Sequence, residues 1–252
     1  MIKKEIGIIY FAYINPNQHW KEIIRGQIKD IKLSKIMSNS SLYVVISNPC
    51  HVPLVKEFFL SLNIEISSID EYFENKFEYY PLEKLWLLAK ENFHNYFVYL
   101  HTKGMSYKKK FSLVKRNLRE IVLTHYLFKD YKITLSAFNN NKNLAIAGPF
   151  PAITFGENSL DRQFIWFNFM WLRASYVCKV EEPKITDNRF YYESWSSETL
   201  NSDDNSKIQA YSTLKQDYCS FKESEATKAL QFIKKIVKYT YPLSLLYLYF
   251  SI

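Results

Sequence analysis

The chain has 252 residues, of which 48% are hydrophobic and 23% charged, and it contains only 5 Gly and 8 Pro. This composition excludes a disordered protein and favours a globular domain with a full core. The formal net charge of +8 favours an anionic partner, which could be nucleic acid, an anionic membrane surface or a phosphorylated substrate.

The first part of the chain reads as a strand, a helix and a second strand. Residues 6–14 form a continuous apolar run, which is typical of a strand buried on both faces. After an Asn-Pro-Asn turn, apolar side chains recur at helical spacing over residues 20–31. Residues 42–46 then predict a second buried strand. This order predicts a βαβ unit with parallel strands.

The same alternation continues along the chain. Pro81 suits the first turn of an amphipathic helix, and residues 96–100 follow as a strand. The spacing of apolar residues over 111–125 predicts another helix, and residues 144–147 predict another strand. Alternating strands and helices predict an α/β fold built on a mostly parallel sheet.

Polar side chains follow the strand predicted at residues 96–100, in the run His101, Thr102, Lys103, Gly104. Ligands of such sheets bind beyond the carboxyl ends of the strands. An imidazole, a hydroxyl and a lysine beside a glycine suit the neutralisation of a diphosphate. Tyr13, at the end of the first strand, joins this candidate phosphate-binding set. The alternative is a polar exit from the strand whose lysine faces water.

Two aromatic segments lie further along, at residues 168–176 and 189–195. Aromatic stretches pack in protein cores more often than they bind sugars. Glu193 lies between aromatic neighbours, and such a carboxylate is a candidate general base. The alternative for Glu193 is a structural ion pair with Arg189, four residues earlier.

Together these segments resemble a family of bacterial and viral GT-A-like glycosyltransferases. Residues 79–107 (YYPLEKLWLLAKENFHNYFVYLHTKGMSY) resemble its helix with a leucine–tryptophan pair and its strand ending in Leu-His-Thr-Lys-Gly. FNFMWLRASY at residues 167–176 and RFYYESW at residues 189–195 resemble two later segments of the family. The opening strand, turn and helix also fit, so the resemblance covers roughly residues 5–200 in order.

The resemblance implies a nucleotide-diphosphate-sugar transferase with a GT-A-like, Rossmann-like α/β domain. It implies a glycan or lipid-linked acceptor, in surface polysaccharide, lipopolysaccharide or glycoprotein synthesis. It places His101, Thr102 and Lys103 near the donor and Glu193 near the sugar or acceptor, where Glu193 is the expected catalytic carboxylate if the enzyme inverts the anomeric configuration. The residues expected near the sugar or acceptor are Asn168, Trp171, Arg189 and Trp195.

The chain departs from the family at several positions. Phe167 stands where the family usually has Gly, and Met170, Leu172 and Ser194 also differ from its pattern. The Asp-x-Asp metal motif is absent from the predicted strand end, and the Asp-Asp pair at residues 203–204 lies in a predicted polar loop. A requirement for Mn²⁺ or Mg²⁺ therefore stays open, because fixed cations could neutralise the diphosphate instead.

The C-terminal part, residues 223–252, differs from the transferase domain expected over residues 1–222. Its first half predicts a basic amphipathic helix, and residues 239–252 carry no charge. A basic helix followed by an uncharged tail suits docking on an anionic membrane surface. The uncharged run at residues 239–252 is too short, and too interrupted by Pro242, to span a membrane. The alternative is a helix packed on the domain, with its tail in a groove or an oligomer interface.

The cysteines and the N-terminus bear on the compartment. The three cysteines have no CxxC spacing and fit a reducing compartment, and the five histidines show no metal-ligand pattern. Glu5, close after the first lysines, and the lack of a small-residue cleavage site argue against a signal peptide. We therefore expect a cytoplasmic protein, peripheral on the inner face of the membrane if its C-terminal part docks there.

Two other functions stay open. A nucleic-acid-binding module would fit the charge and the aromatic residues, but the sequence has no recognisable reader motif and its basic residues are dispersed. We therefore expect no nucleic-acid partner. A catalytically inactive, transferase-like glycan-binding protein stays open because of the departures around Phe167.

Overall fold

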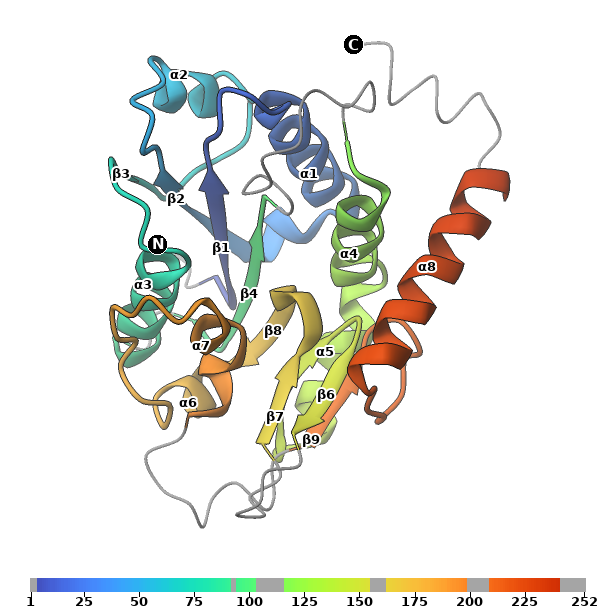
Figure 1. Ribbon diagram of the computed structural model, residues 1–252. Coiled ribbons are helices and arrows are strands. Elements are labelled where there is room, and N and C mark those ends of the chain that lie inside the picture. Colours follow the sequence, from blue (N-terminus) through green and yellow to red (C-terminus); the bar gives the residue numbers. More distant parts are fainter. Residues whose placement is uncertain (1–3, 92–93, 103–115, 155–161, 199–208, 241–252) are drawn as a thin grey trace.

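The computed structural model describes residues 4–91, 94–102, 116–154, 162–198 and 209–240 (Figure 1). A seven-stranded sheet lies at its centre, and its strands in spatial order are β3 (Ser68–Tyr72), β2 (Ser40–Ser47), β1 (Ile6–Tyr13), β4 (Tyr96–His101), β8 (Met170–Arg173), β5 (Leu144–Gly148) and β9 (Gln209–Ser212). A separate antiparallel hairpin consists of β6 (Pro151–Thr154) and β7 (Arg162–Ile165).

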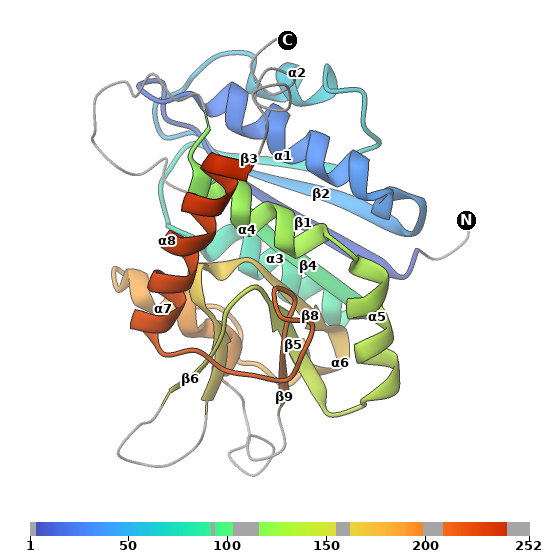
Figure 2. The same ribbon diagram turned by 90° about the vertical axis from the view of Figure 1, so that its right-hand side faces the viewer.

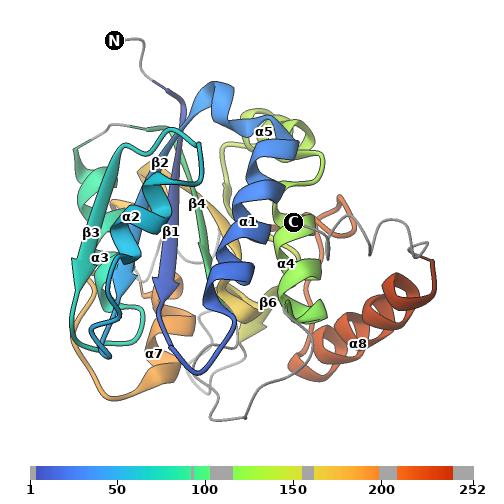
Figure 3. The same ribbon diagram turned by 90° about the horizontal axis from the view of Figure 1, so that it is seen from above.

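Helices cover both faces of the sheet (Figures 1 and 3). On one face lie α1 (Trp20–Ser34), α2 (Val55–Leu60), α4 (Leu118–Phe128), α5 (Tyr131–Asn140) and α8 (Glu223–Thr240). On the other lie α3 (Tyr79–Lys90), α6 (Ala174–Val177) and α7 (Arg189–Ser194). Short 3-10 turns occupy Ile36–Asn39, Trp166–Asn168 and Trp195–Ser197. The predicted α/β fold is confirmed.

The first strand is covered on both sides, as its continuous apolar run predicts. Ile8 and Tyr10 belong to the core on the α1 side, and Ile9 and Phe11 belong to the core on the α3 side. β1 pairs in parallel with β2 on one side and with β4 on the other. The parallel βαβ unit predicted for the start of the chain is therefore confirmed.

The sheet is mostly parallel, with β8 as its antiparallel member. β8 lies between β4 and β5, where Trp171 is opposite Val98 on one side and Ala147 on the other. The sequence marks residues 168–176 by their aromatic character and by their resemblance to a family segment, and neither feature indicates a central strand. In the fold, part of this segment fills the middle of the sheet.

The helix predicted over residues 111–125 begins later than its apolar spacing indicates. Residues 111–115 lie outside the described part of the chain. Asn117 has an extended backbone, and its side chain accepts a hydrogen bond from the backbone N–H of Arg119. Asn117 is therefore the N-cap, and α4 begins at Leu118, because a side-chain cap satisfies one of the donors that open a helix.

The last helix lies beside α4 (Figures 2 and 3). Ala226 and Leu230 of α8 are buried in the same core as α1 and α4, so this helix packs on the domain. Within the described residues, no helix has the length and apolar character needed to cross a membrane. The uncharged tail, residues 241–252, lies outside the described part of the chain.

Candidate functional site

The carboxyl ends of β1 and β4 are tied together at Thr102. The Thr102 hydroxyl oxygen lies 2.9 Å from the backbone N–H of Tyr13, which donates to it, and the backbone N–H of Thr102 donates to Phe11 O at 3.0 Å. Tyr13 and Thr102 are thus neighbours at the strand ends, as the sequence predicts for parallel strands. Burial is the main cause of a raised pKa for Tyr13, so its phenol stays protonated near neutral pH.

His101, the last residue of β4, faces the turn that precedes β8. Its Nε2 lies 3.2 Å from the carbonyl oxygen of Phe167, and its ring is 5.1 Å from that of Phe169. A carbonyl oxygen only accepts hydrogen bonds, so Nε2 carries the proton in this contact. The resemblance segments at residues 79–107 and 167–176 therefore meet at His101.

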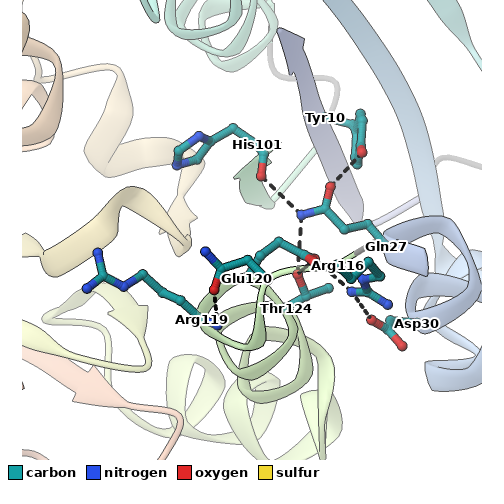
Figure 4. Close-up of polar contacts among 9 residues, drawn as sticks. Tyr10, Gln27, Asp30, His101, Arg116, Arg119, Glu120 and Thr124 are labelled. Carbon is teal, nitrogen blue, oxygen red and sulfur yellow. Dashed lines mark hydrogen bonds and ion pairs between the residues drawn. The ribbon is translucent and has the colours of Figure 1, made fainter. Parts of the chain in front are cut away.

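A buried glutamine holds the backbone at this strand end (Figure 4). The Gln27 amide accepts a hydrogen bond from the Tyr10 hydroxyl at 2.6 Å and donates to His101 O at 3.0 Å and to Thr124 Oγ1 at 3.3 Å. Gln27 is fully buried, and its amide thus connects β1, the end of β4 and α4. Satisfied buried polar groups of this kind fix one backbone arrangement.

An ionic cluster continues this network toward the start of α4 (Figure 4). Arg116 donates to both carboxylate oxygens of Glu120, at 2.8 and 2.7 Å, and to Asp30 at 3.0 Å. Burial disfavours the charged guanidinium, but the Glu120 and Asp30 carboxylates raise the pKa of Arg116 above its ordinary value. A Cβ on Gly26 would collide with the Arg116 side chain, so a larger residue there would displace the paired guanidinium.

Asn168 joins the turn before β8 to the helices on the α3 side. Its Nδ2 donates to Glu78 Oε2 at 2.6 Å and to the carbonyl oxygen of Tyr192, in α7, at 3.1 Å. Both partners are acceptors, which fixes the orientation of the amide. Its buried Oδ1 has no hydrogen-bond partner among the described residues. This oxygen could accept a hydrogen bond from a hydroxyl or N–H of a ligand.

Phe167 and Asn168 are both in the left-handed backbone region, with φ of 73° and 58°. Non-glycine residues adopt this region at a cost, and glycine adopts it readily. Glycine, which the sequence resemblance indicates at the position of Phe167, would adopt this backbone readily. In this chain the Phe167 side chain packs against the core on the α1 side of the sheet.

Glu78 is a site residue that the sequence did not single out. It precedes α3, and its Oε2 accepts hydrogen bonds from the Tyr99 hydroxyl at 2.7 Å and from Asn168. Burial, and then Glu78 itself, raise the pKa of Tyr99 well above its ordinary value, so Tyr99 remains a hydrogen-bond donor. The only local signal was an acidic residue at the start of a helix, a common stabilising position.

Glu193, the candidate base, lies in α7 one residue after Tyr192. Its carboxylate is 3.7 Å from the Arg189 guanidinium, so the ion pair that the sequence left open as an alternative is present. The Glu193 side chain is 23% exposed and that of Arg189 is 48% exposed. A partly exposed ion pair of this type contributes little to stability.

Trp171 and Trp195 do not offer a surface to a ligand in this structure. Both side chains are fully buried. The Trp171 Nε1 donates to Leu127 O and the Trp195 Nε1 to Glu181 O, each at 2.9 Å. Because the rings are enclosed and their N–H groups are satisfied, this placement argues against the expected contact of either tryptophan with a sugar, and both are core residues here.

Some predicted features fall outside the described residues. Lys103 and the Asp-Asp pair at residues 203–204 are among them. Within the described ranges, no three His, Cys, Asp or Glu side chains gather in a way that could hold a metal ion.

Comparisons with known proteins find similarity among solved structures. No family model matches the chain, and no curated protein matches it. Among solved structures, the chain is similar to S. aureus TarS, with 8% identity and a TM-score of 0.43. The match covers 92% of this chain and 39% of the TarS chain, so this chain spans well under half the length of that protein. A likeness of this size says nothing about activity.

Proposed function

We propose that the chain is a glycosyltransferase that transfers a sugar from a nucleotide-diphosphate donor to a glycan or lipid-linked acceptor. The donor diphosphate binds at the strand ends near Tyr13, His101 and Thr102, with Lys103 as a further cation. The sugar lies toward Asn168 and α7, where Arg189 and Glu193 face the acceptor. The domain, residues 1–222, is of the GT-A-like type.

The observation that carries this proposal is the meeting of three segments that are far apart in the sequence. His101 Nε2 contacts Phe167 O, and Asn168 Nδ2 contacts Tyr192 O. These contacts bring together the His-Thr-Lys-Gly element and the two later segments that resemble the glycosyltransferase family. They do so beyond the carboxyl ends of parallel strands, where α/β sheets bind nucleotides.

Glu193 is the proposed general base of a single-displacement reaction. The acceptor hydroxyl oxygen forms a bond to the anomeric carbon while the bond from that carbon to the nucleoside diphosphate breaks. Glu193 takes the proton of the attacking hydroxyl, and the diphosphate leaves with the bonding electron pair. Hydrogen-bond donors and cations at the strand ends stabilise the charge that develops on the leaving diphosphate. The products have the inverted anomeric configuration.

We propose that the protein docks on an anionic membrane surface on the cytoplasmic side, and the exposed face of the C-terminal helix supports the docking. Lys228, Phe232 and Lys235 recur at helical spacing on the side of α8 turned away from the core, and Phe232 is 63% exposed. Exposed lysines attract anionic headgroups, and an exposed aromatic ring inserts at the interface. A membrane-bound enzyme of this kind would meet lipid-linked acceptors directly.

A ligand screen tests the proposed activity. Nucleoside diphosphates and nucleotide sugars are added to the full chain, with and without Mn²⁺ or Mg²⁺, and the melting temperature is recorded. A ligand at one hundred times its Kd stabilises the folded state by about 2.7 kcal/mol, which corresponds to a rise of about 5–10 °C for a chain of this size. Release of nucleoside diphosphate is then measured for each donor that binds. If no nucleotide shifts the melting temperature and no donor is consumed, the proposal fails.

A further inference from the structure

Arg119 carries a charge that the described structure does not use. It lies in the first turn of α4, half-buried, and its guanidinium is 5.5 Å from the centre of the Phe167 ring. Within the described residues, no carboxylate forms an ion pair with Arg119 and no acceptor forms a hydrogen bond with its guanidinium. Arg116, three residues earlier, is instead fixed by Glu120 and Asp30. The two arginines therefore have different roles.

The position of Arg119 is unfavourable for the helix alone. A helix N-terminus carries partial positive charge and is stabilised by anions, so a cation in the first turn is repelled. The acidic residue of the same turn, Glu120, is buried and already paired with Arg116. An anion bound at the N-terminal end of α4 would be attracted both by the helix N-terminus and by the Arg119 guanidinium.

The contact with Phe167 connects Arg119 to the site at the strand ends. The Phe167 ring lies against the Arg119 guanidinium, and the Phe167 carbonyl oxygen lies 3.2 Å from His101 Nε2. Figure 4 shows the Arg119 guanidinium and the His101 imidazole pointing to the same side, away from Gln27. A cation–π contact with an aromatic ring holds a guanidinium and leaves its N–H groups able to donate hydrogen bonds to a ligand.

We propose that Arg119 is a phosphate-binding residue and that its guanidinium contacts the diphosphate of the nucleotide-sugar donor. This assignment rests on the proposed function, since it names a further residue of the same site. Arginine suits this role because its planar N–H groups match two phosphate oxygens at once. The ligand class is a nucleoside diphosphate, and inorganic pyrophosphate is its simplest probe.

The test compares two arginines that both lie over a phenylalanine ring. Arg25, in α1, is exposed and its guanidinium is 5.0 Å from the centre of the Phe58 ring. Arg119→Gln and Arg25→Gln remove the same charge and the same kind of ring contact. Calorimetry with a panel of nucleoside diphosphates and with pyrophosphate should show binding weakened about ten-fold or more by Arg119→Gln and unchanged by Arg25→Gln. Arg119→Lys should fall between Arg119→Gln and the original protein, because it keeps the charge and loses the paired contact.

The outcomes separate this inference from the function on which it rests. If the original protein binds neither a nucleoside diphosphate nor pyrophosphate, the proposed function fails and the role of Arg119 with it. If the original protein binds and Arg119→Gln binds equally well, Arg119 is not a phosphate ligand, while the proposed function stands. Equal weakening by Arg119→Gln and Arg25→Gln would indicate a general charge effect and would also overturn the assignment. If Arg119→Gln does not fold, Arg119→Lys provides the test. The assignment of Arg119 as a phosphate ligand would be overturned if Arg119→Lys bound pyrophosphate as tightly as the original protein and its binding depended less on salt than a phosphate contact requires.

Discussion

Replacing Arg116 with methionine probes the buried ionic cluster between α1 and α4. Glu120 is fully buried and accepts two hydrogen bonds from Arg116 and one, at 3.0 Å, from the Thr124 hydroxyl. Methionine keeps an unbranched apolar stem beside Gly26 and removes the guanidinium. The variant Arg116→Met therefore leaves the Glu120 carboxylate with the Thr124 hydroxyl as its remaining described donor.

The expected loss of stability is large. Removing one partner of a buried ion pair costs about 3–5 kcal/mol, because the other charge is left uncompensated. For a chain of this size, each kcal/mol corresponds to about 2–4 °C in Tm. The melting temperature of Arg116→Met should therefore fall by about 6–20 °C.

The loss should also depend on pH. Burial raises the pKa of Glu120, and the Arg116 guanidinium opposes that rise. In Arg116→Met the folded-state pKa of Glu120 rises further above its unfolded value of about 4.3. A group with a raised folded pKa contributes stability below its unfolded pKa, and that contribution is lost as the pH rises through the folded pKa. The deficit of the variant should therefore be larger near pH 7.5 than near pH 4.5.

Denaturant titrations at the two pH values measure this directly. The double variant Arg116→Met/Glu120→Met serves as the control, because replacing both charges by apolar side chains should restore more than half of the lost free energy. A deficit below about 1 kcal/mol, or one that is equal at both pH values, would refute the reasoning, since an exposed pair behaves in that way.

Three further outcomes are expected. Glu193→Gln should lower the rate of sugar transfer by about 10²–10⁴-fold with donor affinity unchanged; near-normal turnover, or an unfolded variant, would remove Glu193 as the base. Lys228→Glu combined with Lys235→Glu should reduce sedimentation with anionic vesicles and leave nucleotide binding intact, and retention on those vesicles would count against membrane docking through α8. Because the folded-state pKa of buried Tyr99 is raised, Tyr99 contributes folding stability below the unfolded-state tyrosine pKa of about 10. This contribution is lost as the pH rises from that value toward the folded-state pKa. Tyr99→Phe should therefore reduce the slope of this alkaline loss by about 1.4 kcal/mol per pH unit, and an unchanged slope in denaturant titrations would contradict it.

The part of the fold that was predictable from the sequence is the part with a local signature. β1, β2 and β4 are buried on both faces, so each is a continuous apolar run that needs no knowledge of its partners. β8 lacks such a signature. Trp171 pairs with Val98, which lies 73 residues earlier in the chain, and the aromatic segment at residues 168–176 is compatible from sequence with either core or sugar-binding surface. The burial of Trp171 follows from that distant pairing.

The candidate site shows the same division. Thr102 and Tyr13 could be placed together from the sequence, because the carboxyl ends of neighbouring parallel strands share one edge of the sheet. Arg119 and Glu78 could not, since each is an ordinary charged residue at the start of a helix. Their significance depends on the turn at Phe167 and Asn168, whose backbone the sequence does not specify.

The turn before β8 holds two costly features together. Each left-handed non-glycine residue costs about 1–3 kcal/mol, and a buried amide oxygen without a partner costs about 1–3 kcal/mol. The hydrogen bonds that Asn168 donates to Glu78 and Tyr192 hold the turn in this conformation. The hydrogen bond between His101 and the Phe167 carbonyl oxygen does the same. These bonds leave Asn168 Oδ1 buried beside the helix that carries the candidate base. A hydroxyl of a bound sugar would supply the missing donor, which is why we propose that the sugar binds at Asn168 and not at the enclosed tryptophans.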